Sequence, residues 1–133
     1  MLEINGIPPK LTNQVCEELL CQQYYYEGKL VQEVDILLLK INGRWHQLYF
    51  DAGVVFWRIK QGAPEPNVQE EGSPFSYPLL DIGEQYGLRD CTISEVLTEP
   101  LVEGVRVSLV FDEQGTLLIT NSDNMTHMKF NMF

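Results

Sequence analysis

Basic side chains are scarce in this sequence of 133 residues. Nine Lys and Arg stand against 19 Asp and Glu, which gives a formal net charge of -10. Proteins that coat nucleic-acid phosphates or an anionic membrane surface need the opposite sign, because those partners are themselves negative. The charge therefore argues against nucleic-acid and membrane partners.

Long apolar runs and targeting signals are missing too. The apolar run Ile36–Leu39 is far shorter than the roughly 20 residues that cross a bilayer. Residues 1–10 lack the basic start and the apolar stretch of a secretory signal. We therefore expect the mature chain to begin here and the protein to be cytoplasmic.

Cysteine and histidine are few, and the familiar catalytic motifs are absent. The three cysteines, Cys16, Cys21 and Cys91, form no Cys-x-x-Cys pair, so we expect reduced thiols and no metal site. We interpret His46 as a residue of the core or its rim. No Gly-x-Ser-x-Gly, Gly-x-x-x-x-Gly-Lys or Gly-x-Gly-x-x-Gly motif occurs. The sequence thus predicts no cofactor and favours a protein that is not an enzyme.

The length and a change of hydrophobic period predict an α+β fold in a single domain, residues 1–133. Apolar residues recur at helical spacing from Leu11 to Tyr26, which predicts one amphipathic helix. Branched and aromatic residues then fill 34–41, 45–50 and 54–59, with turn residues between them, which is typical of a three-stranded meander. We expect the N-terminal helix to pack on a mostly antiparallel meander sheet of about six strands, a twisted sheet or half-barrel.

The second half of the chain supplies the remaining strands. Residues 61–78 contain four of the seven prolines and show no period, so we interpret them as a loop or mobile flap. Asp81 is placed to cap a short helix. Residues 91–98 fit a strand or a helix, and we favour a strand. A second hairpin over 105–120 and an edge strand over 125–133 complete the prediction.

Both faces of the first meander are apolar. A two-residue turn at Asn42-Gly43 sets the cross-strand pairs Leu39–His46, Leu37–Leu48 and Asp35–Phe50. Because neither face alternates with polar residues, each needs a cover. We expect the helix to cover one face and the second hairpin group the other. The alternative cover is a partner molecule, which includes a second copy of the chain in a homo-oligomer.

Most of the negative charge belongs to one segment. Residues 61–104 carry nine acidic side chains and one base, Arg89, whereas the segments before and after are close to neutral. A surface of this kind can steer and hold a basic protein partner. The candidate partner-binding residues are Glu65, Glu70, Glu71, Asp81, Glu84, Asp90, Glu95 and Glu99.

In composition, this small acidic α+β chain without catalytic motifs resembles many bacterial immunity proteins, which neutralise basic nuclease toxins. The resemblance implies a cytosolic protein-binding module, immunity-like or regulatory, whose acidic surface engages a basic protein. The alternative is a small apolar-ligand carrier, or a simple enzyme, with a cavity in the curved sheet and segment 61–78 as its gate. A third hypothesis is an accessory subunit whose second sheet face is completed by another chain.

Overall fold

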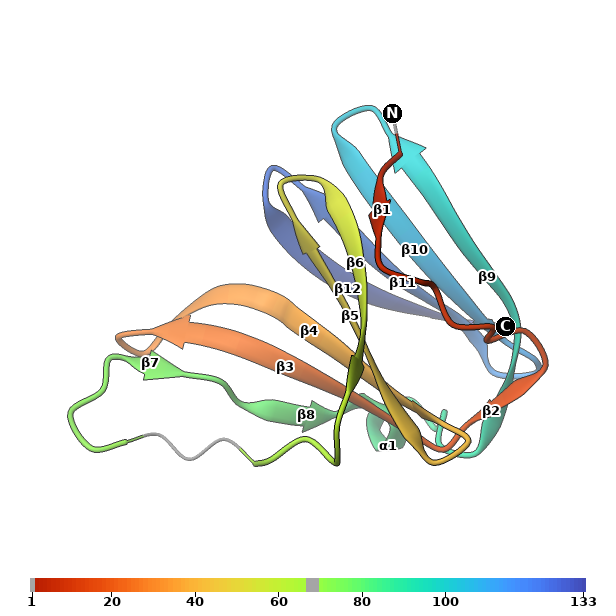
Figure 1. The fold of residues 1–133 in the computed structure, drawn as a ribbon, viewed down its shortest axis with the longest axis horizontal. Helices are drawn as coiled ribbons and strands as arrows, with labels where there is room; N and C mark the ends of the chain where they lie inside the picture. Colours follow the sequence, from red (N-terminus) through yellow and green to blue (C-terminus); the bar gives the residue numbers. More distant parts are fainter. Residues whose placement is uncertain (1, 67–69) are drawn as a thin grey trace.

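Two β-sheets make up almost the whole protein (Figure 1). The computed structural model describes residues 2–66 and 70–133. Strands cover 64% of the chain and helices 3%, so the protein is almost all β and the predicted α+β class is wrong. Among the described residues, no helix is long and apolar enough to span a membrane.

Each sheet contains a four-stranded antiparallel meander, over residues 18–60 in the first and 91–132 in the second, with short strands added at its edges. The strands of the first sheet are β1 Ile4–Asn5, β3 Glu18–Tyr26, β4 Lys29–Ile41, β5 Arg44–Asp51, β6 Val54–Lys60, β7 Phe75–Ser76 and β8 Leu79–Asp81. Their order is β1-β6-β5-β4-β3-β7, and β8 also pairs with β3. The strands of the second sheet are β2 Gln14–Cys16, β9 Cys91–Leu101, β10 Gly104–Phe111, β11 Gly115–Ser122 and β12 Met125–Met132. Their order is β12-β11-β10-β9-β2, and helix α1, Ile82–Gln85, lies in the connection between the sheets.

The prediction of an amphipathic helix over Leu11–Tyr26 is wrong. This segment makes a tight turn, in which the Gln14 amide donates to the Leu11 carbonyl over 3.0 Å, and then forms β2 and β3. β3 pairs with β4 on one edge and with β7 and β8 on the other, and Leu19 and Cys21 have no exposed surface. A central strand that is apolar on both faces shows no clean alternation, so its spacing fits a helix by coincidence.

The turn and strand predictions of the remaining chain are largely confirmed. Asn42 and Gly43 have φ of +51° and +73°, the left-handed conformation that a two-residue hairpin turn requires. The turn pairs Leu39 with His46 and Leu37 with Leu48, as predicted. The Asp81-capped helix, the strand over 91–98, the second hairpin and the C-terminal strand are all present. The predicted loop over 61–78 contains the short strand β7, and its residues 67–69 lie outside the described residues.

The start of β4 joins the two sheets through side chains. The predicted pairing of Asp35 with Phe50 is wrong, since the described ladder between β4 and β5 runs only from Leu37 to Ile41. Before Leu37, β4 lies against β12. There the Gln32 side chain accepts a hydrogen bond from the Thr126 amide over 2.9 Å, and Glu33 accepts one from the Met128 amide over 2.7 Å. These side chains occupy backbone donors of β12 that would otherwise pair with another strand.

The core lies between the inner faces of the two sheets. Leu37, Leu39 and Leu48 of the first sheet and Leu109 and Leu117 of the second have no exposed surface and belong to one cluster. The second sheet therefore covers the face that the helix was expected to cover.

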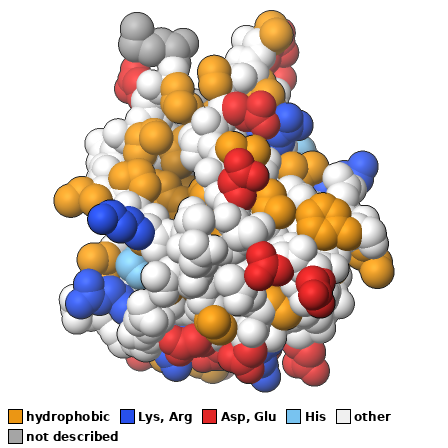
Figure 2. Space-filling model, turned by 90° about the vertical axis from the view of Figure 1, so that its right-hand side faces the viewer, with side chains coloured by type: hydrophobic (Ala, Val, Ile, Leu, Met, Phe, Trp, Pro, Cys, Tyr) orange, Lys and Arg blue, Asp and Glu red, His pale blue; other side chains and the backbone are white. Residues whose placement is uncertain are grey.

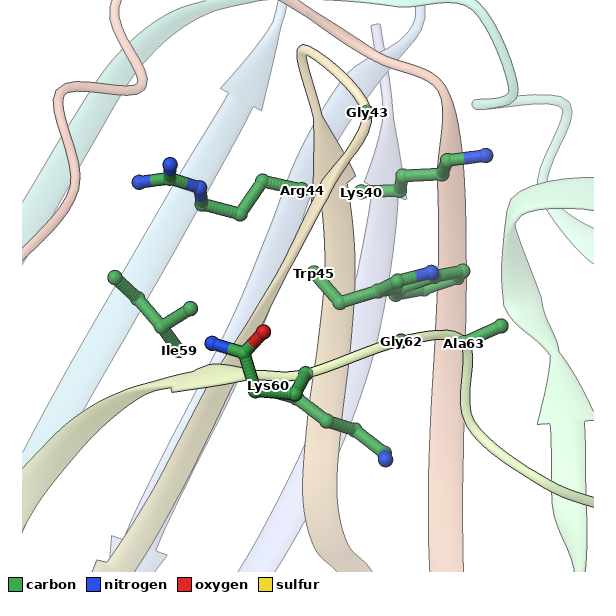
Figure 3. Close-up of a pocket in the computed structure, with 9 residues that line it drawn as sticks. Lys40, Gly43, Arg44, Trp45, Ile59, Lys60, Gly62 and Ala63 are labelled. Carbon is green, nitrogen blue, oxygen red and sulfur yellow. The ribbon is translucent and has the colours of Figure 1, made fainter.

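The outer face of the first sheet is covered in part by the chain itself. Leu38 and Trp45 lie on this face, yet they are only 2% and 5% exposed. Figure 3 shows the chain after β6 running past the Trp45 ring at Gly62 and Ala63, and these residues line one hollow with it. An intramolecular cover was predicted for this face, but the second hairpin group was expected to provide it.

Replacing Gln32 with Ala tests the junction of β4 and β12. The change removes the acceptor of the Thr126 amide and a donor to the Asn124 carbonyl, so we expect the free energy of unfolding to fall by about 1–3 kcal/mol. Urea unfolding followed by tryptophan fluorescence measures the loss. Gln61→Ala, at an exposed glutamine that makes no described hydrogen bond, is the matched control and should stay within about 0.5 kcal/mol of the parent. If the two changes lowered the free energy of unfolding equally, the hydrogen bonds between Gln32 and β12 would not stabilise the junction as described.

Candidate functional site

Four aromatic rings cluster at one end of the first sheet. The cluster, named here the aromatic end, consists of Tyr24 and Tyr26 on β3, Phe75 on β7 and Tyr77 just after it. Tyr24 stacks on Tyr77 at 5.2 Å between ring centroids, and Tyr26 tilts against Phe75 at 5.4 Å. Tyr26, Phe75 and Tyr77 are 42%, 44% and 39% exposed. Clusters of solvent-exposed aromatic rings are typical of interaction surfaces, since monomers rarely expose such apolar patches to solvent.

Strand pairing holds these rings together. The paired residues Tyr26 and Phe75 share one face of the sheet, and Tyr24 contacts both Phe75 and Tyr77 on that face. Two backbone hydrogen bonds fix the partner segment along β3, from Glu27 to the Pro74 carbonyl at 2.8 Å and from Gln23 to the Pro78 carbonyl at 2.9 Å. The rings are therefore positioned by backbone pairing and not by ring contacts alone.

Acidic side chains border the aromatic end. Glu27 occupies the turn between β3 and β4, directly after Tyr26, and Glu70 and Glu71 belong to the turn before β7, in which the Ser73 amide donates to the Glu70 carbonyl. All three are exposed, and none has an ion-pair partner among the described residues. This arrangement places unneutralised negative charge around an exposed aromatic surface.

The structure does not gather the eight acidic residues selected from the sequence onto one surface. Glu70 and Glu71 lie beside the aromatic end, and Glu65 is exposed in the segment after β6. Glu95 and Glu99 lie on β9, on the side of the molecule opposite β7 (Figure 1). Figure 2, which faces that opposite side, shows acidic side chains scattered among hydrophobic and neutral ones.

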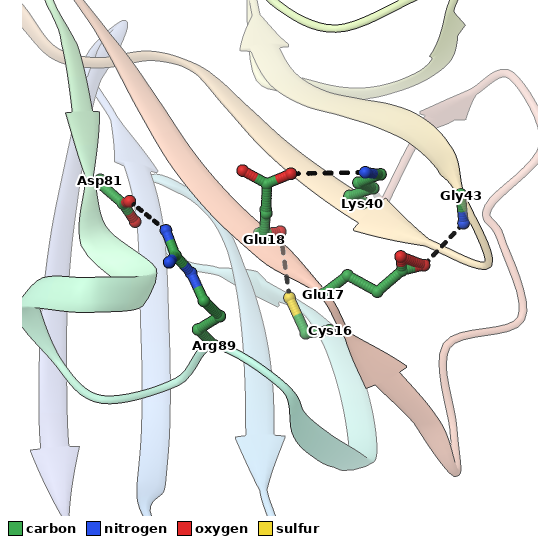
Figure 4. A network of polar contacts seen from close by, with 7 residues as sticks. All are labelled: Cys16, Glu17, Glu18, Lys40, Gly43, Asp81 and Arg89. Carbon is green, nitrogen blue, oxygen red and sulfur yellow. Dashed lines mark hydrogen bonds and ion pairs between the residues drawn. The ribbon is translucent and has the colours of Figure 1, made fainter.

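Two of the eight acidic residues have structural partners within the chain. Asp81 caps α1 by accepting from the Glu84 amide over 3.0 Å, and it pairs with Arg89 at 2.7 Å (Figure 4). Glu99 pairs with Arg106 at 2.9 Å. Glu84 and Asp90 are exposed near α1. Segment 61–104 is thus acidic along the chain but divided in space, and only its first part adjoins a patch of exposed rings.

The four residues of the aromatic end were not among the site residues predicted from the sequence. The run Tyr24-Tyr25-Tyr26 was assigned to a helix, and Phe75 and Tyr77 were assigned to a loop without structure. Three consecutive tyrosines are more typical of a strand, because aromatic side chains favour the pleated surface. That propensity was the available signal.

Cationic side chains gather at the other end of β4. A groove of about 570 Å³, named here the cationic groove, runs along the N-terminal segment and the β4–β5 turn. Its lining residues are Ile7, Pro8, Pro9, Lys10, Ile41, Asn42, Arg44, His46 and Ile59. The hollow beside Trp45 in Figure 3 adjoins it and shares Arg44 and Ile59 with it. Neither lining contains an acidic residue.

His46 lies on the inner face of the first sheet opposite Leu39, as the turn predicted. It is half-buried. Burial, as the larger cause, and the nearby charge of Arg44, as the smaller one, lower the pKa of its imidazole below the ordinary value. Both burial and the positive charge of Arg44 thus disfavour the protonated form of the His46 imidazole.

The cysteines lie apart from both surfaces. All three are free thiols, and burial raises the pKa of Cys16 and of Cys21 to about 12. Cys91 is half-buried, and its pKa is raised by burial and by Asp90. Within residues 2–66 and 70–133, no three His, Cys, Asp or Glu side chains lie close enough together to hold a metal ion.

Comparison of the chain with protein families, with curated proteins and with solved structures finds no match in any of the three. The functional interpretation therefore depends on the positions, burial and charges of the described residues.

Thiol labelling tests the burial of the cysteines. At about pH 8 we expect Cys16 and Cys21 to resist a disulfide reagent in the native protein, because a pKa near 12 leaves about one thiol in ten thousand ionised. Cys91 should react first, and all three should react in denaturant. Mass spectrometry of peptides locates the label, and Cys91→Ser should abolish the early phase. Native labelling of Cys16 at the rate of Cys91 would show that β2 is not packed as described.

Proposed function

We propose that the protein is a binding module that holds a basic protein partner at its aromatic end. The observation that carries this proposal is the cluster of exposed rings bordered by the carboxylates of Glu27, Glu70 and Glu71, which make no ion pair with the residues that the structure describes. An immunity-like or regulatory protein needs a surface of this kind, because its task is to hold another protein.

The chemistry of the rings supports an arginine-bearing partner. Tyrosine and phenylalanine present large contact areas at a low cost in side-chain entropy, and tyrosine is enriched among residues that dominate binding energy. A guanidinium over a ring face gains about 0.5–2 kcal/mol from the cation–π interaction. The chain itself contains one such contact, with Arg58 lying 5.3 Å from the centroid of the Phe56 ring.

The bordering carboxylates support the same class of partner. Opposite charge around a contact surface raises the association rate and selects against acidic competitors. One base, the exposed Lys29, is the cross-strand partner of Tyr26, so three carboxylates and one ammonium group surround the rings and the border is negative overall. This surface replaces the broad acidic segment 61–104 as the place of contact.

A second candidate function is a carrier of small apolar ligands. The cavity expected within the curved sheet is replaced by packing, since Leu39, Leu48 and Leu109 fill the space between the sheets. The cationic groove at the molecular surface favours a modified form of this candidate.

Binding of an octa-arginine peptide at low ionic strength tests the proposed contact. We expect Phe75→Ala to weaken binding about fivefold or more, because it removes the ring that joins Tyr24 and Tyr26. Phe75→Leu keeps an apolar side chain but loses the ring face, and it should weaken binding as well. Isothermal calorimetry gives the affinities, and circular dichroism verifies the fold of each variant.

Matched controls separate this surface from the net charge. Leu97→Ala removes an exposed apolar side chain from β9 and should leave the affinity unchanged. Glu71→Gln should weaken binding more than Glu95→Gln, although both remove one charge. Equal losses for the two glutamates, with no effect of Phe75→Ala, would show that the peptide senses only the charge of -10.

A further inference from the structure

The cationic groove opens where the inner face of the first sheet loses its cover. Leu39, His46 and Ile59 form one cross-strand row on that face. Leu39 has no exposed surface, His46 is half-buried, and Ile59 is 54% exposed. The same apolar face that forms the core thus continues into solvent towards β6, and the N-terminal segment around Pro9 supplies the opposite wall.

The cations of this groove make no ion pair among the described residues, and the Glu17 carboxylate beside Arg44 instead accepts a hydrogen bond from the Gly43 amide over 2.6 Å (Figure 4). Lys10 and Arg44 have no ion-pair partner in the described part of the protein, whereas the adjacent Lys40 is paired with Glu18 at 3.5 Å (Figure 4). The lining contains no carboxylate, although the sequence has 19. The chain as a whole is strongly acidic. The groove differs from the rest of the surface, because two cations without a described ion pair lie beside exposed isoleucines there.

We propose that the cationic groove binds a small aliphatic carboxylate. The anionic head would lie at Arg44 and Lys10, where a guanidinium can donate two parallel hydrogen bonds to a carboxylate. The hydrocarbon chain would lie on Ile7 and Ile59, which line the groove and are 90% and 54% exposed, and would cover apolar surface that is now in water. The groove volume of about 570 Å³ falls in the range of small-molecule sites. The positive potential that Arg44 imposes on His46 supports the same sign of ligand.

Octanoate is the probe for this site, followed by amide chemical shifts of the full chain. We expect saturable shifts at Arg44, His46 and Ile59. Octanol has the chain without the charge and acetate has the charge without the chain, so each should bind at least about fivefold more weakly. Octanol binding as tightly as octanoate would contradict the charged contact, and acetate binding as tightly would contradict the apolar one.

Variants place the ligand within the groove. Arg44→Gln should weaken octanoate binding about tenfold, since it removes a charge-assisted contact. Ile59→Ser should weaken it several-fold through loss of apolar contact. Lys129→Gln is the control for Arg44→Gln, because Lys129 is an exposed lysine on β12 without an ion-pair partner among the described residues. It should leave the affinity unchanged.

Three outcomes would overturn this site. The first is the absence of saturable shifts, and the second is an equal effect of Arg44→Gln and Lys129→Gln. The third is a glutamate-rich peptide that shifts the groove residues while octanoate does not, since the groove would then be a protein contact. Because the groove and the aromatic end lie at opposite ends of β4, failure here leaves the binding of octa-arginine unaffected.

Discussion

β4 runs for 13 residues and pairs with β3 from Lys29 to Lys40. At about 3.3 Å per residue, the strand spans roughly 40 Å. Its first half lies against β12 through Gln32 and Glu33, and its second half pairs with β5. The pairing with β3 therefore positions the junction of the two sheets, the inner face of the first sheet and both ends of the molecule.

The two ends of β4 differ in charge and in chemistry. The turn at its start carries Glu27 next to the exposed rings of Tyr26 and Phe75. The turn at its end carries Arg44 next to exposed Ile59 and half-buried His46. A long strand separates the two surfaces, so the two proposed ligands of opposite charge would lie at opposite ends of β4. The net charge of -10 conceals this division.

Local signals in the sequence were sufficient for turns and regular strands. The hairpin and register at Asn42-Gly43 could be predicted, because asparagine and glycine are the residues that most readily adopt the two left-handed conformations of this turn. Local signals were not sufficient for β3. It is a strand because it pairs on both edges, with partners that lie up to about 60 residues away in the chain. Apolar and polar residues do not alternate regularly along β3, so no period of two reveals the strand, and tertiary pairing overrides the apparent helical period.

The candidate surface was predictable only in part. Counting charges along the chain located Glu70 and Glu71, but it also grouped them with Glu99, which pairs with Arg106 on the other sheet. Burial and pairing in three dimensions decide which carboxylates remain free. The aromatic end was hidden for a related reason, since Tyr24 and Phe75 meet only through the pairing of β3 with β7.

Residue-resolved mapping of octa-arginine on the labelled protein tests the central claim most directly. We expect chemical-shift changes to concentrate on Tyr24–Glu27 and on residues 70–77, with Glu95 and Glu99 unaffected. Changes spread evenly over the acidic residues of both sheets, or centred on β9, would contradict it.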